Sequence, residues 1–229
     1  MLMHLFIMSN IKLFYSEYSI GNKKLFSSGK KNKSIDGTGI LPSVDEKASK
    51  SILNYIKKFY PHVNNILDIG SGQGYLTKTC DDLKDFDFNC YSMEGCSELI
   101  PHVKCDKNKY AIVDFSEQFT DNRLEKQFDL TTSFEVLEHI HRKHQDIFWD
   151  NLMYVSKEHL CSIHVANQED HEHCCIRPLE EWIKYLSSKG TITILGKHPS
   201  SLDNTSCNFR SETGLTNWDC SIMLHVKFY

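Results

Sequence analysis

Three alternating glycines follow a short apolar run that contains one acid. The run is 66–69, and the residues of interest are Asp68, Gly70, Ser71, Gly72 and Gly74. Glycines at this spacing allow a tight turn and let a ligand lie against bare backbone. A nicotinamide dinucleotide motif would need a glycine at position 75, where the chain has Tyr75. Asp68 would repel a pyrophosphate but pair with an ammonium, so the turn predicts a zwitterionic ligand that carries an amine and a carboxylate.

Two further acids follow predicted strands. Glu94, with Gly95 behind it, comes 26 residues after Asp68, close to where an acid accepts two ribose hydroxyls in a βαβ unit. Asp114 and Phe115 combine a hydrogen-bond acceptor with an aromatic ring, which suits an adenine. A helix cap beside a core phenylalanine explains the second pair equally well, so both interpretations stay open.

Strand and helix patterns alternate along most of the chain. Predicted strands cover 66–69, 88–93, 110–113, 128–132, 159–165, 191–195 and 221–228. Predicted helices cover 43–59, 75–84, 97–103, 140–155 and 179–186, the first beginning with a Ser43–Glu46 capping box. This alternation predicts a mainly parallel sheet with helices on both faces, and a last strand that is antiparallel. Ligands of such sheets bind at the carboxyl ends of the strands.

These segments, together with the string FEVLEH at 134–139, resemble the class I S-adenosylmethionine-dependent methyltransferases. The resemblance covers about residues 66–190. It implies a Rossmann-like, doubly wound α/β fold with seven strands, the last inserted antiparallel next to the sixth. We expect a methyltransferase domain at 44–229 behind an N-terminal arm or helical cap at 1–43. The cofactor-binding residues implied are Asp68, Gly70, Ser71, Gly72, Gly74, Glu94, Gly95, Asp114, Phe115 and Phe134.

The acceptor side is less clear, because methyl transfer asks mainly for alignment and exclusion of water. Glu135 borders the transferred methyl group by the resemblance, and His173 lies in a histidine-rich stretch after the fifth strand. An imidazole there is a candidate general base. No Asn/Asp-Pro-Pro-Tyr/Phe sequence follows the fourth strand, which argues against methylation of adenine or glutamine amino groups. We therefore expect a small-molecule or glycan acceptor methylated on oxygen or carbon.

There are three alternatives to a metal-free methyltransferase of small molecules or glycans: two metal-binding sites and one protein without catalysis. A magnesium-dependent methyltransferase of RNA 3′-terminal 2′-hydroxyls would use Glu135, Glu138, His139 and either His171 or His173. Against it, the string also occurs in metal-free methyltransferases, and position 140 is Ile where a second histidine is expected. A zinc site would use His171, His173, Cys174 and Cys175, whose adjacency strains chelation. We predict no metal. A cofactor-binding module without catalysis is the third alternative.

The composition is that of an ordinary globular protein. The 229 residues carry 26 Lys and Arg against 30 Asp and Glu, a net charge of −4, which gives no bulk attraction to nucleic acid. Residues 1–33 hold six lysines and one acid. We expect this basic segment to be a solvated terminus, the alternative being an arm that approaches a phosphate or membrane surface.

Cysteine usage and hydropathy bear on the compartment. The nine cysteines include no Cys-x-x-Cys pair and are odd in number, which indicates reduced, mostly buried thiols in a cytoplasmic protein. The apolar start, Met1–Met8, is too short to span a bilayer and makes a poor signal peptide. We expect no membrane segment. The pattern leaves the oligomeric state open.

Overall fold

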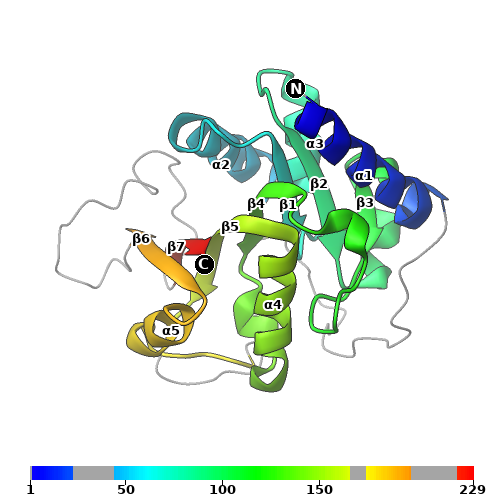
Figure 1. The fold of residues 1–229 in the computed structure, drawn as a ribbon. Helices are drawn as coiled ribbons and strands as arrows, with labels where there is room; N and C mark the ends of the chain where they lie inside the picture. Colours follow the sequence, from blue (N-terminus) through cyan, green and yellow to red (C-terminus); the bar gives the residue numbers. More distant parts are fainter. Residues whose placement is uncertain (1, 23–43, 166–173, 197–220) are drawn as a thin grey trace.

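The computed structural model describes residues 2–22, 44–165, 174–196 and 221–229. A seven-stranded sheet forms its centre (Figure 1). The strands are β1 (Asn65–Ile69), β2 (Asn89–Glu94), β3 (Tyr110–Ile112), β4 (Phe128–Phe134), β5 (Ser156–His164), β6 (Gly190–Gly196) and β7 (Ser221–Phe228). Their order is β3-β2-β1-β4-β5-β7-β6, with β1 to β5 parallel and β7 antiparallel to both β5 and β6. The predicted fold class is confirmed.

Helices cover both faces of the sheet (Figure 1). One face carries α2 (Glu46–Phe59) and α3 (Tyr75–Leu83), and their apolar sides pack on residues such as Ile66 and Leu130. The other face carries α1 (Leu2–Tyr18), α4 (Gln145–Val155) and α5 (Leu179–Leu186). The strand order reverses between β1 and β4, so the carboxyl ends of these two strands mark the place where a ligand is expected.

The N-terminal segment is not the solvated terminus expected for residues 1–33, at least as far as residue 22. It forms α1, which packs against β3 and the 3-10 turn η4 (Asn122–Leu124). Ile11 and Phe14 are fully buried, and Arg123 pairs with Glu17 at 3.2 Å. The expectation was wrong because the lysine count hid a helical apolar spacing at Ile11, Phe14, Tyr15 and Tyr18. The other five lysines of this segment, between residues 23 and 33, lie outside the described residues.

Several predicted boundaries also needed correction. Helix α2 is capped by Asp45, whose carboxylate accepts from the Ala48 N–H at 2.7 Å, and not by the predicted Ser43, which lies outside the described residues. The helix predicted from residue 140 begins at Gln145, after two 3-10 turns, η5 (Leu137–His139) and η6 (Arg142–His144). The helix predicted over 97–103 is the 3-10 turn η2 (Ser97–His102). These short turns lie at the carboxyl edge, where the backbone departs from regular structure.

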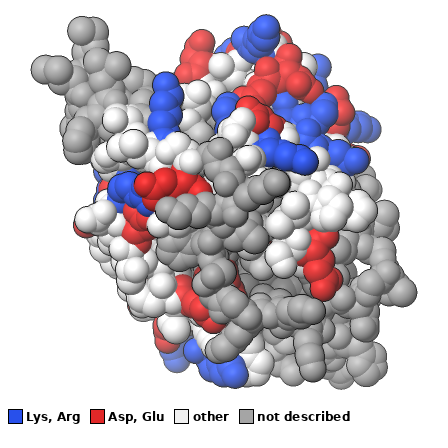
Figure 2. Space-filling model, turned by 90° about the vertical axis from the view of Figure 1, so that its right-hand side faces the viewer, with Lys and Arg blue, Asp and Glu red and all other residues white. Residues whose placement is uncertain are grey.

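The surface and the thiols agree with the composition. Figure 2 shows Lys and Arg intermixed with Asp and Glu among the described residues of the face it presents. All seven cysteines in the described ranges are free thiols, and only Cys174 is exposed. Among the described helices, none has the length and apolar character needed to cross a bilayer.

Candidate active site

The turn after β1 has three glycines in the left-handed region, with φ at 65° for Gly70, 55° for Gly72 and 77° for Gly74. A side chain at Gly70 would meet Val136 at 2.6 Å, and one at Gly74 would meet the Cys105 sulfur at 2.6 Å. A side chain at Gly72 would meet nothing within 4 Å. Packing therefore requires Gly70 and Gly74, whereas Gly72 faces space that a ligand can fill.

The same turn is tied to the end of β2. The N–H groups of Gly70 and Ser71 both donate to the Met93 carbonyl, at 2.9 and 3.2 Å. The Gly74 N–H donates to the Ser71 carbonyl at 2.9 Å, and α3 begins at the next residue. These bonds place the glycine turn beside the residue that follows Met93, which is Glu94.

Glu94, the last residue of β2, directs its carboxylate toward the glycine turn. Its Oε2 accepts from the Gly72 N–H at 2.9 Å, and its Oε1 accepts from the Cys96 N–H at 3.0 Å. Burial raises the pKa of Glu94 above its usual range, and hydrogen bonds from backbone N–H groups, including that of Gly95, oppose this rise. The structure thus brings Glu94 and Gly72 together, and their roles toward a cofactor stay predictions.

Asp68 lies one residue before the end of β1 and is only 4% exposed. Its Oδ1 accepts from the Thr132 hydroxyl of β4 at 2.7 Å. Burial raises the pKa of Asp68 to about 7, helped by the nearby Glu94 and opposed by the Thr132 hydrogen bond. A buried carboxyl group of this kind is ready to receive a cationic partner, because such a partner would stabilise its charged form. Thr132 carried no sequence signal.

Asp114 and Phe115 follow β3. Asp114 Oδ1 accepts from the Ser116 N–H at 2.9 Å and from the Ser116 hydroxyl at 2.6 Å, which closes a local turn. The Phe115 ring is buried and stacks on Phe119, with ring centroids 5.8 Å apart. Asp114 thus closes a turn and Phe115 is a core ring, which is close to the alternative of a helix cap beside a core phenylalanine. The role of the two residues toward an adenine stays a prediction.

Two carboxyl groups stand together at the end of β4. Phe134 is buried, and Glu135 then takes a left-handed φ of 57° while its N–H donates to the Ser162 hydroxyl at 2.9 Å. Glu138 on η5 is fully buried beside Glu135. Burial, and then the charge of Glu135, raise the pKa of Glu138 well above its usual range. The magnesium alternative requires this adjacency, and the spacing of three residues on a 3-10 turn allows it.

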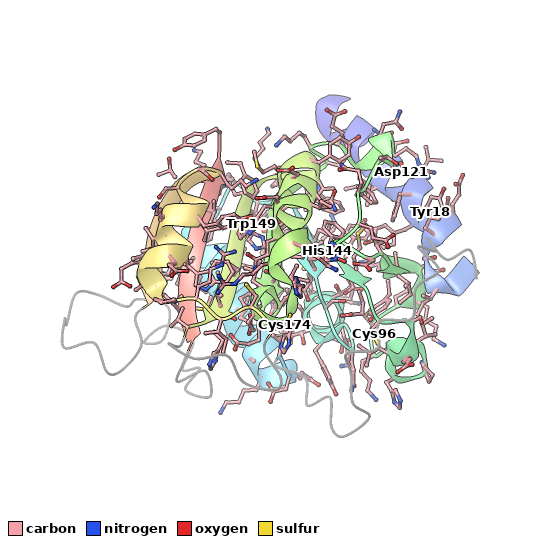
Figure 3. The ribbon with its side chains drawn as sticks, turned by 90° about the horizontal axis from the view of Figure 1, so that it is seen from below. Tyr18, Cys96, Asp121, His144, Trp149 and Cys174 are labelled. Carbon is pink, nitrogen blue, oxygen red and sulfur yellow. The ribbon has the colours of Figure 1, made fainter. Side chains whose placement is uncertain are left out.

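Residues 175 and 176, which come after β5 in the sequence, lie at the same place. His171 and His173 lie outside the described residues, but the chain just after them is held against η5 and η6. The Cys175 N–H donates to the Glu138 carbonyl at 2.9 Å, and Arg142 Nη2 donates to the Ile176 carbonyl at 3.1 Å. Cys174 and His144, which come from these two parts of the chain, are labelled in Figure 3. Within the described ranges, no three His, Cys, Asp or Glu side chains form a group suited to a metal ion.

The sheet order, the glycine turn with open space at Gly72, and the acids at the carboxyl ends of β1 and β2 define a class I methyltransferase fold. The chain belongs to a family described as "Methyltransferase domain", whose model matches residues 42–218. S-adenosylmethionine is the cofactor of this class of enzyme, and the residues present fit it: the space at Gly72 lies beside Glu94, and Asp68 can receive an ammonium group.

Solved structures with the same fold act on different acceptors. The plantazolicin methyltransferase BpumL in complex with S-adenosylhomocysteine is 17% identical, with a TM-score of 0.56, 97% of this chain covered and 99% of that one. The methyltransferase domain of the bacterial CtHen1 is 13% identical, with a TM-score of 0.54 and 80% and 98% covered. The glycopeptide N-methyltransferase MtfA, solved with S-adenosylmethionine, is 11% identical, with a TM-score of 0.52 and 80% and 95% covered. At these identities the likeness shows the fold alone. Among curated proteins, none matches the chain.

Proposed function

We propose that the chain transfers a methyl group from S-adenosylmethionine to an oxygen or carbon atom of a small molecule or glycan. The observation that carries the acceptor class is the position of residues 175 and 176 at the end of β4. There the chain around Cys175 and Ile176 is hydrogen-bonded to η5 and η6, which favours an enclosed site over an open groove. The likeness to BpumL and MtfA supports this class of acceptor, because plantazolicin and glycopeptides are not nucleic acids.

In this proposal, different residues bind different chemical groups of the cofactor. When bound, S-adenosylmethionine supplies a methyl group on an electron-poor sulfonium, so the protein needs no covalent step of its own. Asp68 binds the ammonium, and the carboxylate lies against the glycine turn near the N-terminus of α3. The Glu94 carboxylate accepts hydrogen bonds from the ribose hydroxyls. Other residues proposed to contact the cofactor belong to the glycine turn or lie near the ribose, the adenine and the methyl group. They are Gly70, Ser71, Gly72, Gly74, Gly95, Asp114, Phe115 and Phe134.

The acceptor is oriented by Glu135 and His173. Glu135 stands at the end of β4 with its backbone fixed by Ser162. A base is needed only where the acceptor loses a proton, and an imidazole at position 173 can take it near neutral pH. We expect residues 175 and 176, held against η5 and η6, to help exclude water from this region, which suits a reaction that depends on alignment.

The test is turnover with pooled metabolites and glycans, read as formation of S-adenosylhomocysteine. Wild type should form product from at least one pool, and His173→Gln and Glu135→Gln should lower the rate about 100-fold or more. His62→Gln is the matched control, because His62 precedes β1 at the opposite edge of the sheet, 3.4 Å from Glu158. No product from any pool supports instead the third alternative, a cofactor-binding module without catalysis.

A second candidate is the magnesium-assisted methylation of RNA 3′-terminal 2′-hydroxyls. The observation in its favour is the pair of adjacent carboxyl groups at Glu135 and Glu138, next to His139. These three residues do not by themselves form a group suited to a metal ion in the described structure. With His171 or His173 and a shift of their side chains they would hold a divalent cation that acidifies the hydroxyl. Activity on RNA that is lost with a chelator and in Glu138→Gln favours this candidate. Activity on a metabolite that is indifferent to chelator excludes it.

A further inference from the structure

We propose that Tyr110 is a positioning residue for the cofactor-binding turn, acting through the Gly72 carbonyl. The inference rests on the proposed function, since it concerns how the chain prepares the turn for S-adenosylmethionine. Tyr110 is the first residue of β3 and is fully buried. Its hydroxyl donates to the carbonyl of Gly72, 38 residues earlier in the sequence.

Both polar groups of Gly72 are thereby occupied. Its N–H donates to Glu94 Oε2 at 2.9 Å, and its carbonyl accepts from Tyr110. Gly72 lies in the left-handed region with no other atom within 4 Å of where a side chain would begin. Without a side chain, and with open space where one would stand, Gly72 has many backbone conformations open to it. The two hydrogen bonds hold Gly72 in one of them from opposite ends.

The segment before Tyr110 reinforces the same turn. The Lys104 N–H donates to the Gln73 carbonyl at 2.9 Å, and the Cys105 sulfur fills the space beside Gly74. The turn is therefore held at three successive residues by a stretch of chain that carries no recognisable cofactor motif. Tyr110 is the part of this stretch whose contribution can be removed by deleting a single hydroxyl group, which bonds the Gly72 carbonyl and also interacts with the Ser71 side chain.

The N-terminal segment supports Tyr110 from behind. Ser19 forms an antiparallel bridge with Ala111, and Ile20 packs in one apolar cluster with Tyr110 and Ile112. The end of the N-terminal helix thus lies one layer of side chains from the cofactor turn. This gives α1 and the residues after it a part in shaping the site, and not only in covering the sheet.

The energetic consequence follows from preorganisation. If the turn visits other conformations, the apparent dissociation constant rises by the inverse of the fraction that remains competent to bind. A buried carbonyl that loses its donor is unfavourable by about 1–3 kcal/mol, so the competent fraction can fall by about tenfold. Loss of the hydroxyl should therefore weaken cofactor binding without removing any group that touches the cofactor.

The experiment compares Tyr110→Phe with Tyr15→Phe in the full chain. Tyr15 is also buried, and its hydroxyl also donates to a backbone carbonyl, that of Ser92 at 3.1 Å, which lies in β2 beside Asp68 and not in the glycine turn itself. Calorimetric titration with S-adenosylhomocysteine gives the dissociation constants, and urea unfolding gives the stabilities. Hydrogen exchange reports the backbone amides of residues 72–74.

We expect both variants to lose similar stability, and only Tyr110→Phe to raise the dissociation constant by about tenfold and speed exchange at 72–74. An unchanged dissociation constant in Tyr110→Phe, or an equal rise in Tyr15→Phe, overturns the proposal for Tyr110 alone. Failure of the wild type to bind S-adenosylhomocysteine overturns the proposed cofactor site itself, so the two failures are distinguishable.

Discussion

The hydroxyl of Thr132 donates to Asp68 Oδ1 at 2.7 Å and so joins the carboxyl ends of β4 and β1, at the point where the strand order reverses. The two residues are also paired in the sheet register. Through this bond the acid is held at the mouth of the glycine turn. Burial nevertheless raises the pKa of Asp68 to about 7, and a positively charged partner would stabilise its ionised form.

Replacing Asp68 by Asn should therefore weaken the binding of S-adenosylhomocysteine by about 10- to 100-fold, because a charge-assisted hydrogen bond to the ammonium is lost. Asp129→Asn is the matched control. Its carboxylate accepts from the N–H groups of Asn64 and Asn65 at the amino edge of the same sheet. Calorimetry measures both variants. An Asp68→Asn affinity within twofold of wild type would contradict the role given to Asp68.

The same carboxyl group predicts a pH dependence. Affinity for S-adenosylhomocysteine should fall as pH drops below about 7, approaching tenfold per pH unit, because binding requires the ionised form of Asp68. In the cofactor-free protein the folded pKa exceeds the unfolded one, so this group's contribution to stability is lost as pH rises from about 4 to 7. Titrations between pH 6 and 8.5 test the first point. A profile equally steep in Asp68→Asn would assign the effect to another group.

The glycine turn allows a paired comparison of two substitutions. Gly72→Ala places a methyl group in open space at a φ of 55°, with a strain of about 1–2 kcal/mol, and should abolish most cofactor binding because it occupies the ligand's space. Gly70→Ala drives a methyl group to 2.6 Å from Val136 and should mainly destabilise the fold. Thermal unfolding and calorimetry on both variants separate the effects. Equal losses of binding and stability in the two would argue against an open cradle at Gly72.

His159 gives a prediction about stability that is independent of the site. It is fully buried between Thr131 and Ser133, which hydrogen-bond its two ring nitrogens at 2.9 Å each. Burial lowers the pKa of His159 to about 3. The unfolded chain therefore binds more protons below pH 6.5, and the free energy of unfolding should fall by about 2 kcal/mol between pH 7.5 and 5 from this residue.

The check is urea unfolding across that pH range in wild type and His159→Gln. The variant should be less stable at pH 7.5 but show a shallower decline toward pH 5. His102→Gln, which removes an exposed imidazole, should keep the wild-type slope. A slope in His159→Gln as steep as in wild type would show that other groups cause the decline.

Much of the sheet and the cofactor side could be predicted because their signals are local. The apolar run before Asp68, the glycine spacing and the acid at Glu94 all sit within short stretches, and the parallel sheet then brings them together. The antiparallel β7 could also be predicted from its alternation, because Ile222, Leu224 and Val226 pack on one face of the sheet, although Met223 is buried on the other.

The features that escaped prediction depend on contacts between distant parts of the chain. Thr132 and Tyr110 matter through hydrogen bonds to residues 64 and 38 positions away, and neither belongs to a motif. Glu138 is buried because the chain around Cys175 folds back over it. The position of α1 on the sheet follows from the absence of a regular helix between β3 and β4 in the described structure, a space that local spacing does not reveal.

The central claim is that the turn from Asp68 to Gly74 receives the amino-acid end of S-adenosylmethionine. Its most direct test is calorimetric titration of the wild-type chain at pH 8 with S-adenosylhomocysteine, alongside a nicotinamide dinucleotide. We predict saturable binding of one S-adenosylhomocysteine per chain and no heat from the dinucleotide. Absence of binding to S-adenosylhomocysteine, or equal binding of both compounds, would contradict the account.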